Sequence, residues 1–296
     1  MARILGVGVA TVDTIVVVDG FPREDSKVRV LERRVRRGGN AATALTVLSD
    51  LGHECRFAGV LGDDPEAELI RADLRAARVD ASGCRVIPGA PTLTAEVILN
   101  RATGSRTILH HRALPELGYA DFERLELESL DWVHFDGRNA AQTRRMLELV
   151  RARRPRLPRS VELERNRPGI ETLFAHAEVL IFSRSFADEW SFSSPRPFLE
   201  HVRRLSAEPH LVCAWGEEGS FALGVDGRFH FAPALRLERV VDSLGAGDTF
   251  NAGLIDGLLK TADLRTALEL ANRIAGLKCA QEGFAGLAAK ARQTAA

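Results

Sequence analysis

A short turn that combines glycines with a carboxylate is the part of this sequence best equipped for chemistry. Residues 242–248 read Asp-Ser-Leu-Gly-Ala-Gly-Asp, and apolar residues at helical spacing follow directly. Gly245 and Gly247 lack a Cβ, so an anion can approach the main chain closely, and the free N–H groups of a first helical turn favour a phosphate there. A phosphate would repel Asp248 unless a hydroxyl group lay between them. In that arrangement Asp248 would accept the hydroxyl proton as the oxygen attacks phosphorus.

A simpler interpretation of the same turn is structural. Aspartate is a favoured N-cap, and Gly-x-Gly occurs in ordinary turns. The turn is not a Walker A loop, because no Gly-Lys-Ser/Thr follows at the required spacing and Lys260 comes too late. Any phosphate must therefore be held mainly by backbone amides, with basic side chains supplied from elsewhere in the chain.

The composition bounds the class of protein. A chain of 296 residues that is 45% apolar can bury a large core, and its 40 basic and 40 acidic residues cancel. We therefore expect neither nucleic acid nor an anionic membrane surface as a partner. The 4 cysteines are widely spaced and predict reduced core thiols rather than disulfides or a zinc site. Without a long apolar run or a signal-peptide pattern, the sequence predicts a soluble, untargeted, cytoplasmic protein.

The rest of the chain alternates between strands and helices. Residues 4–9 are nearly all apolar, as in a buried parallel strand. No third glycine follows Gly6 and Gly8 and no helix begins there, which argues against a dinucleotide-binding dehydrogenase. Further strands are predicted at 57–61, 132–135, 179–182 and 211–215, and helices at 40–51, 65–77 and 141–150. This order predicts an α/β fold whose mostly parallel sheet is covered on both faces, with residues 1–296 forming one domain.

Three strand-like segments do not fit that alternation. Residues 27–36 alternate apolar and charged positions, and residues 92–99 and 105–111 form a hairpin pattern around 100–104. We interpret residues 11–37 and 91–113 as the strands of a small β-sheet lid. Closing such a lid over a substrate would exclude water from the reaction.

Three polar features have structural explanations. Asn40 is a candidate N-cap behind which small residues pack, and the basic residues 151–159 are predicted to form a solvated turn. His134 lies in an apolar strand, where a satisfied core residue is expected. The 8 histidines show no metal-ligand spacing.

Residues 242–250, Asp-Ser-Leu-Gly-Ala-Gly-Asp-Thr-Phe, resemble the C-terminal signature of the ribokinase-like (PfkB) carbohydrate kinases, and within that family the ketohexokinases. Further segments that match in the right order are 24–29, 37–41, 137–140, 213–219 and 279–286. Several segments in order are more specific than any one of them. The resemblance implies a three-layer α/β/α ribokinase-like fold, ATP-dependent phosphorylation of a primary hydroxyl of a sugar, a need for Mg²⁺, and a homodimer that pairs through the lid.

The resemblance also implies roles for individual residues. Asp248 takes the place of the family's catalytic base, residues 244–247 form the anion hole (including Gly245, Ala246 and Gly247), and Arg106 reaches the transferring phosphate. The implied sugar contacts are Asp13, Asp25, Gly39, Asn40, Thr43, Ser105, Asp136, Arg138 and Asp248. The implied nucleotide contacts are Arg106, Gly216, Glu217, Glu218, Gly219, Gly245, Ala246, Gly247 and Asp248.

Around the sugar, the sequence departs from the ketohexokinase pattern. Thr43 and Ser105 stand in place of asparagines, Asp136 replaces a glutamate, and residues 111–112 also differ. A ketohexose such as fructose is the favoured substrate. The alternatives are a kinase for another sugar or for a nucleoside, and a catalytically silent ligand-binding member of the fold.

The sequence also leaves undecided which residues bind the metal ion. Ser-Arg-Ser-Phe at residues 183–186 replaces the family's Asn-x-x-Glu magnesium motif, and Glu217 is a candidate that would act through water. The resemblance further implies a K⁺ site near Asp242 and Gly283.

Overall fold

A nine-stranded sheet forms the centre of the computed structural model, which describes residues 1–293. Its strands are Arg3–Val7 (β1), Glu54–Ala58 (β4), Val79–Asp80 (β6), Trp132–Asp136 (β10), Arg159–Leu163 (β11), Val179–Ser183 (β12), His210–Ala214 (β13), Ser220–Leu223 (β14) and Phe229–Ala232 (β15). They lie in the order β15-β14-β13-β12-β11-β10-β1-β4-β6. The pairs from β13 through to β6 are parallel, and β14 and β15 add an antiparallel edge.

The central strands are apolar because both faces of the sheet are covered. On β10, Val133 and Phe135 belong to the core on one face, while Trp132 belongs to the core on the other. Successive side chains of a strand point to opposite faces, so a nearly continuous apolar run is what a fully buried strand requires.

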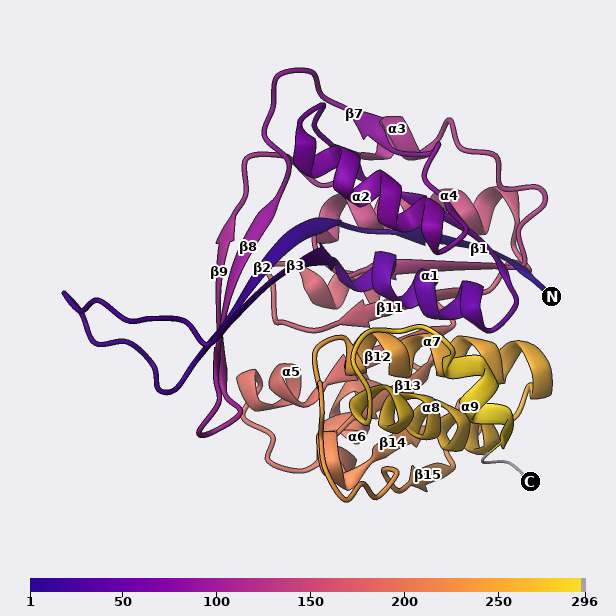
Figure 1. Cartoon of the computed structure of the whole chain (residues 1–296). Helices are drawn as coiled ribbons and strands as arrows, with labels where there is room; N and C mark the ends of the chain where they lie inside the picture. The colour runs from indigo at the N-terminus through magenta and orange to yellow at the C-terminus, as the bar shows by residue number, and fades with distance from the viewer. Residues whose placement is uncertain (294–296) are drawn as a thin grey trace.

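Helices cover the two faces in separate layers (Figure 1). One layer contains Asn40–Asp50 (α1), Pro65–Ala76 (α2), Ala246–Thr261 (α7), Leu264–Cys279 (α8) and Leu287–Gln293 (α9). The other contains Tyr119–Phe122 (α3), Ala140–Arg153 (α4), Arg184–Glu189 (α5) and Pro195–Leu205 (α6). Two short 3₁₀ helices lie at Ile170–Leu173 (η1) and Gly216–Glu218 (η2). The predicted three-layer α/β/α arrangement is confirmed.

Polar caps begin several of these helices. Asp64, Asn139, Ser183 and Asp263 each accept a hydrogen bond from the backbone amide three residues later, at the start of α2, α4, α5 and α8. Each cap satisfies one of the amides that a first turn leaves without an intrahelical partner. Asn40 is not such a cap: it is the first residue of α1, and Gly39 precedes it with φ +105°.

A second, four-stranded sheet lies beside the carboxyl end of the central sheet (Figure 1). Its strands are Thr11–Val18 (β2), Glu32–Gly38 (β3), Thr94–Asn100 (β8) and Arg106–His111 (β9), in the order β3-β2-β8-β9. We call it the small sheet. A separate two-stranded pairing joins Val60–Leu61 (β5) to Arg85–Val86 (β7).

The strand predicted at 27–36 begins later than its sequence pattern indicates. β3 starts at Glu32, and residues 27–31 belong to an exposed loop between β2 and β3. Alternation of apolar and charged residues continues through that loop. The ladder with β2 begins at the Glu32–Val17 pair, preceded by one hydrogen bond from the Leu31 amide to the Val17 carbonyl at 2.8 Å, so the pattern alone does not produce a strand there.

The solvated turn predicted at the basic residues 151–159 is shorter than expected: an exposed turn at 155–156 forms its centre, and its two ends belong to α4 and β11. α4 continues to Arg153, and β11 begins at Arg159. The Arg159 side chain is buried and forms an ion pair with Glu178, while Arg154 donates to the backbone carbonyl of Leu127 at 2.7 Å. Guanidinium groups have several donors and can satisfy buried acceptors, so a basic run can be part of the packed structure.

The four cysteines, Cys55, Cys84, Cys213 and Cys279, are all free thiols, as the sequence predicts. Within residues 1–293, none of the helices is both long enough and apolar enough to cross a membrane.

Candidate active site

A cavity lies at the carboxyl end of the central sheet, between that sheet, the small sheet and the start of α7. It encloses about 310 Å³. From β1 the sheet continues to β4 on one side and to β10 on the other, so a topological switch point falls between β1 and β10. Ligands of open α/β sheets bind at such points, because the loops that leave the strands there turn in opposite directions and open a crevice.

Most of the predicted site residues are brought together in this cavity. Those that line it are Asp13, Gly39, Asn40, Thr43, Arg106, Arg138, Gly245, Ala246, Gly247 and Asp248. They come from the small sheet, the start of α1, the loop after β10 and the start of α7, which are far apart in the sequence.

Other predicted site residues lie outside the cavity lining. Asp25 lies in the exposed loop between β2 and β3, with φ +56°, and the Ser105 hydroxyl lies 2.7 Å from that of Thr103 in an exposed turn. Gly216, Glu217 and Glu218 form the exposed η2 turn after β13, and the buried Gly219 ends it.

Asp136 is buried directly beside the cavity. Its two carboxylate oxygens accept hydrogen bonds from the amides of Ala41 (3.0 Å) and Val9 (3.1 Å), and the Nε of Arg138 lies 3.6 Å away. Burial raises the pKa of Asp136, although Arg138 and the two amides oppose that rise. This carboxylate therefore ties the ends of β1 and β10 to the start of α1.

Asp248 is the third residue of α7 and does not cap the helix. The N-cap is Gly245, in the left-handed conformation with φ +82°, and no side chain caps this end. Among the residues that the structure describes, the half-buried Asp248 carboxylate has no hydrogen-bond or ion-pair partner. Burial raises its pKa well above the usual value, and the nearby charges of Glu162, Glu164 and Asp136 add to the rise. The interpretation of Asp248 as an N-cap is therefore wrong.

The amides around the turn differ in their availability. The Leu244 amide donates to Asp242 Oδ1 at 2.9 Å, and the Ala246 amide donates to the Ser243 carbonyl at 3.2 Å. Within residues 1–293, the amides of Gly245 and Gly247 make no hydrogen bond. A Cβ on Gly247 would meet nothing within 4 Å, whereas one on Gly245 would lie 2.6 Å from the Phe284 ring. The space in front of Gly247 is therefore open to a ligand.

Basic side chains predominate in the cavity. Its lining includes the arginines Arg36, Arg37, Arg106, Arg112, Arg138 and Arg165, against the acids Asp13, Glu162, Glu164 and Asp248. Arg106, on β9, is exposed and has no hydrogen-bond or ion-pair partner within the described part of the chain. Guanidinium groups match phosphoryl oxygens in geometry and charge, so the cavity suits a polyanionic ligand.

Glu162 and Glu164 are cavity residues that the sequence reasoning missed. They lie two residues apart around the carboxyl end of β11, and Asn40 Nδ2 donates to Glu164 Oε2 at 3.3 Å. Burial raises the pKa of Glu162 to about 8, with smaller contributions from the charges of Asp136 and Glu164. Two acids at alternate positions where a parallel strand ends are the signal that would have identified them.

His134, Asp136 and Glu162 form one buried cluster, with a potential ligand atom of each within 4.8 Å of the others. His134 is 0% exposed, its Nδ1 lies 2.8 Å from the Ser160 hydroxyl oxygen, and burial lowers its pKa to about 4. Its Nε2 has no partner within the described chain, so the expectation of a satisfied histidine holds for one ring nitrogen only.

Residues 1–290 match the pfkB family carbohydrate kinases. Together with the cavity at the switch point, this match shows that the chain belongs to that family, and it is an ATP-dependent carbohydrate kinase. The dehydrogenase interpretation is thereby excluded.

Named relatives agree with this assignment. Ketohexokinase from Mus musculus is 40% identical over 297 residues, which cover 96% of this chain and 98% of the relative. An ATP-dependent ribose-1-phosphate kinase from Halopiger xanaduensis is 25% identical, with 96% and 94% covered. Among solved structures, Arabidopsis thaliana ribokinase complexed with ribose and ATP superposes with a TM-score of 0.80 at 19% identity, over 95% of this chain and 94% of that one. The predicted ribokinase-like fold is confirmed.

Proposed function

We propose that this kinase transfers the γ-phosphoryl group of ATP to a primary hydroxyl of a ketohexose such as fructose. One observation carries the proposal: among residues 1–293 the Asp248 carboxylate has no hydrogen-bond or ion-pair partner, and it lies in the cavity beside the amides of Gly245 and Gly247, which are likewise unbonded there. The likeness to a ketohexokinase over nearly the whole chain supports a ketohexose as the acceptor.

In the proposed reaction, the sugar hydroxyl lies between Asp248 and the γ-phosphate. An alcohol is far more basic than a carboxylate, so Asp248 accepts the proton late, when bonding to phosphorus has made the oxygen acidic. The raised pKa of Asp248 makes its carboxylate a better proton acceptor than an exposed aspartate. The amides of Gly245 and Gly247 and the Arg106 guanidinium stabilise the charge that develops on the phosphoryl oxygens.

The sugar is proposed to contact side chains held in place by local structure. Asp13 is fixed by the Thr11 hydroxyl, which donates to its Oδ1 at 2.6 Å, and a Cβ on Gly38 would lie only 2.1 Å from Asp13 Oδ2. Glycine at position 38 therefore gives this carboxylate its room. Asn40 and Arg138 line the same cavity.

We propose that Glu162 and Glu164 hold the Mg²⁺ that accompanies ATP. Carboxylate oxygens suit this hard cation, which retains several waters and also binds substrate phosphates. When bound, the ion offsets the negative charge of the phosphates. Glu217, the candidate from sequence, is exposed and lies outside the cavity lining.

The whole chain is proposed to act as one domain whose small sheet is the lid, and to work in the cytoplasm as a homodimer paired through that lid. Apolar side chains exposed on the small sheet and its loop support the pairing: Phe21, Val28, Val30, Leu31, Val35 and Leu109. The loop that carries Asp25 extends away from its own site (Figure 1). A sugar contact by Asp25 therefore requires the paired subunit.

A panel of acceptors with coupled detection of ADP tests the substrate. Fructose and other ketohexoses, ribose and other aldoses, and adenosine and other nucleosides are compared by kcat/KM. We expect the largest value with a ketohexose. A larger value with a nucleoside or an aldose would move the assignment to that acceptor, and no ADP with any acceptor would support a catalytically silent member.

A further inference from the structure

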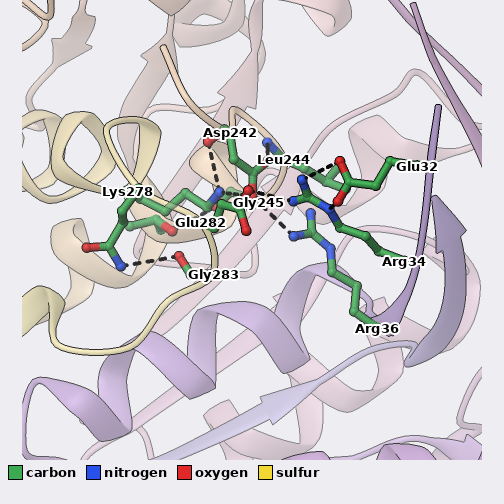
Figure 2. Close-up of polar contacts among 11 residues, drawn as sticks. Glu32, Arg34, Arg36, Asp242, Leu244, Gly245, Lys278, Glu282 and Gly283 are labelled. Carbon is green, nitrogen blue, oxygen red and sulfur yellow. Dashed lines mark hydrogen bonds and ion pairs between the residues drawn. The ribbon is translucent and has the colours of Figure 1, made fainter. Parts of the chain in front are cut away.

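Asp242 joins three separate parts of the molecule through hydrogen bonds and ion pairs (Figure 2). Its Oδ1 accepts from the Leu244 amide at 2.9 Å, within the turn that leads into α7. Its Oδ2 accepts from Arg36 of β3 at 3.1 Å and lies 2.7 Å from the Nζ of Lys278, near the end of α8. Lys278 also donates to the Asp242 carbonyl at 2.8 Å.

This group of charges is largely removed from water. The side-chain exposures are 0% for Lys278, 14% for Asp242 and 23% for Arg36. Burial opposes ionisation of Asp242, but the hydrogen bonds from Lys278 and the Leu244 amide outweigh it and lower its pKa. Loss of one partner from such a group leaves a poorly compensated charge and displaces the others.

A second ion pair attaches the same strand to the loop after α8. Arg34 lies two residues before Arg36, and side chains two apart in a strand share a face. Its guanidinium lies 3.0 Å from Glu282, in the loop after α8 (Figure 2). Of the two arginines, only Arg36 binds a residue that also holds the turn before Gly245.

The resemblance to the family implies a K⁺ site near Asp242 and Gly283. In this chain the Lys278 ammonium already binds both the carboxylate and the carbonyl of Asp242. The oxygens of Asp242 are thus committed to a resident cation. Lys278 supplies this charge from the core, whereas Arg36 supplies it from the small sheet.

We propose that Arg36 is a positioning residue for phosphoryl transfer, which acts through Asp242 on the turn that presents the amides of Gly245 and Gly247. The inference rests on the proposed role of those amides. Arg36 belongs to the lid strand β3, so the position of the lid and the geometry of the phosphate site are coupled through one carboxylate. Displacement of a reacting group by about 1 Å can cost about 10²-fold in rate, so a modest shift of this turn is sufficient.

The test compares Arg36→Gln, Asp242→Asn, the double variant and Arg36→Lys, with Arg34→Gln as the matched control from the same strand. We expect Arg36→Gln to lower kcat by about 10- to 100-fold and to weaken ADP binding while KM for the sugar stays unchanged. Arg36→Lys, which retains a cation at Oδ2, should recover much of the loss. Arg34→Gln should have little effect, because its partner Glu282 does not contact the turn.

Arg36 also lines the cavity, so a direct contact with phosphate is the competing explanation, and the double variant separates the two. If Arg36 acts through Asp242, the double variant should be no worse than the poorer single variant. The inference would be overturned if the losses in kcat of the two single variants multiplied in the double variant. It would also be overturned if Arg36→Gln and Arg34→Gln had the same kcat. ADP affinity, measured by calorimetry, gives the same comparison if Asp242→Asn is too unstable for turnover assays or if no acceptor is phosphorylated. Turnover by the unmodified protein tests the proposed function separately.

Discussion

At the scale of single residues, the proposed chemistry depends on a carboxylate that the fold does not use. Asp136 and Asp242 are both committed to backbone amides and basic side chains, whereas Asp248 has no partner among the described residues. Its charge is disfavoured by burial and by neighbouring acids. Unlike Asp136 and Asp242, Asp248 is not held by hydrogen bonds from the fold, so we propose it as the side chain available to receive a proton.

Replacing Asp248 with asparagine tests this role. We expect Asp248→Asn to retain the fold and to bind ATP, but to lose about 10²–10⁴ in kcat, because removal of a positioned general base typically costs that much. Steady-state kinetics and nucleotide calorimetry measure the two effects. Glu66→Gln, a change of an acid in the first turn of α2, is the control. Near-normal turnover in Asp248→Asn would eliminate the mechanism.

The carboxylates around Asp248 predict how activity depends on pH. Activity needs ionised Asp248, and its raised pKa places the acid limb of the kcat profile above the usual range of an aspartate. Glu162→Gln removes one neighbouring negative charge and so lowers the pKa of Asp248. We therefore expect the limb to move to lower pH in this variant.

The pH profiles of Glu162→Gln, the unmodified protein and a Glu200→Gln control on α6 measure that shift. Because the carboxylates interact, the apparent pKa of each acid limb belongs to the group of carboxylates rather than to a single residue. A limb that stays in place, or that moves to higher pH, would contradict the electrostatic coupling between Glu162 and Asp248.

At the scale of secondary structure, α7 presents the proposed phosphate site and packs closely on α8. A Cβ on Gly253 would lie 2.8 Å from the Cα of Ala271, and one on Gly257 would lie 2.6 Å from the Cα of Ala267. These glycines let the two helix backbones approach each other along one face. The middle and the C-terminal half of α7 are therefore anchored by packing on α8, while its first turn remains open to the cavity.

The substitution Gly247→Val tests whether the open first turn of α7 binds phosphate, because it changes this turn and leaves the packed part of the helix unchanged. The new side chain would meet no protein atom within 4 Å of its Cβ, so we expect little change in thermal stability. It would stand in front of the proposed phosphate position, and ATP affinity should fall by at least tenfold, or about 1.4 kcal/mol. Calorimetry with ATP and a thermal unfolding curve measure the two quantities. Unchanged ATP binding would remove Gly247 from the anion site.

At the scale of the whole molecule, the site lies where two sheets of different character meet. The central sheet is covered on both faces, whereas the β9 strand of the small sheet is exposed along its length. On β9, Arg106 and Ile108 line the cavity. Leu109 directly follows Ile108, and successive side chains of a strand point to opposite faces, so Leu109 points to the face away from the cavity. An exposed apolar face on a sheet is a common site of subunit pairing.

Leu109→Arg tests the proposed dimer. Leu109 is 57% exposed, and a charge at a buried interface would prevent pairing, so we expect monomers by sedimentation equilibrium. The control is Leu205→Arg on α6, where the leucine is 54% exposed and lies away from the small sheet. A dimer that persists in Leu109→Arg, or an unmodified protein that is monomeric, would refute pairing through this face.

Prediction from the sequence succeeded where the physical signal is local. Strand and helix periodicity identified the layers of the fold, and the glycines at 245 and 247 marked the start of α7. It failed for residues 27–31 and for the two ends of 151–159, where pairing and burial in the fold override the local pattern. Glu162 and Glu164 were missed because their significance depends on which strands are neighbours.

The amino-acid sequence by itself determined the alternation of strands and helices, the turn at 242–248 and the family to which the chain belongs, because each of these is encoded in short-range spacing or in matched segments. Only the tertiary structure decided which polar groups remain free. Strand order brings Glu162 and Glu164 toward Asp248, and side chains from β3 and from the end of α8 meet at Asp242, which is thereby committed to Arg36 and Lys278. Such partnerships depend on distances in space between residues remote in the chain, which no local pattern records.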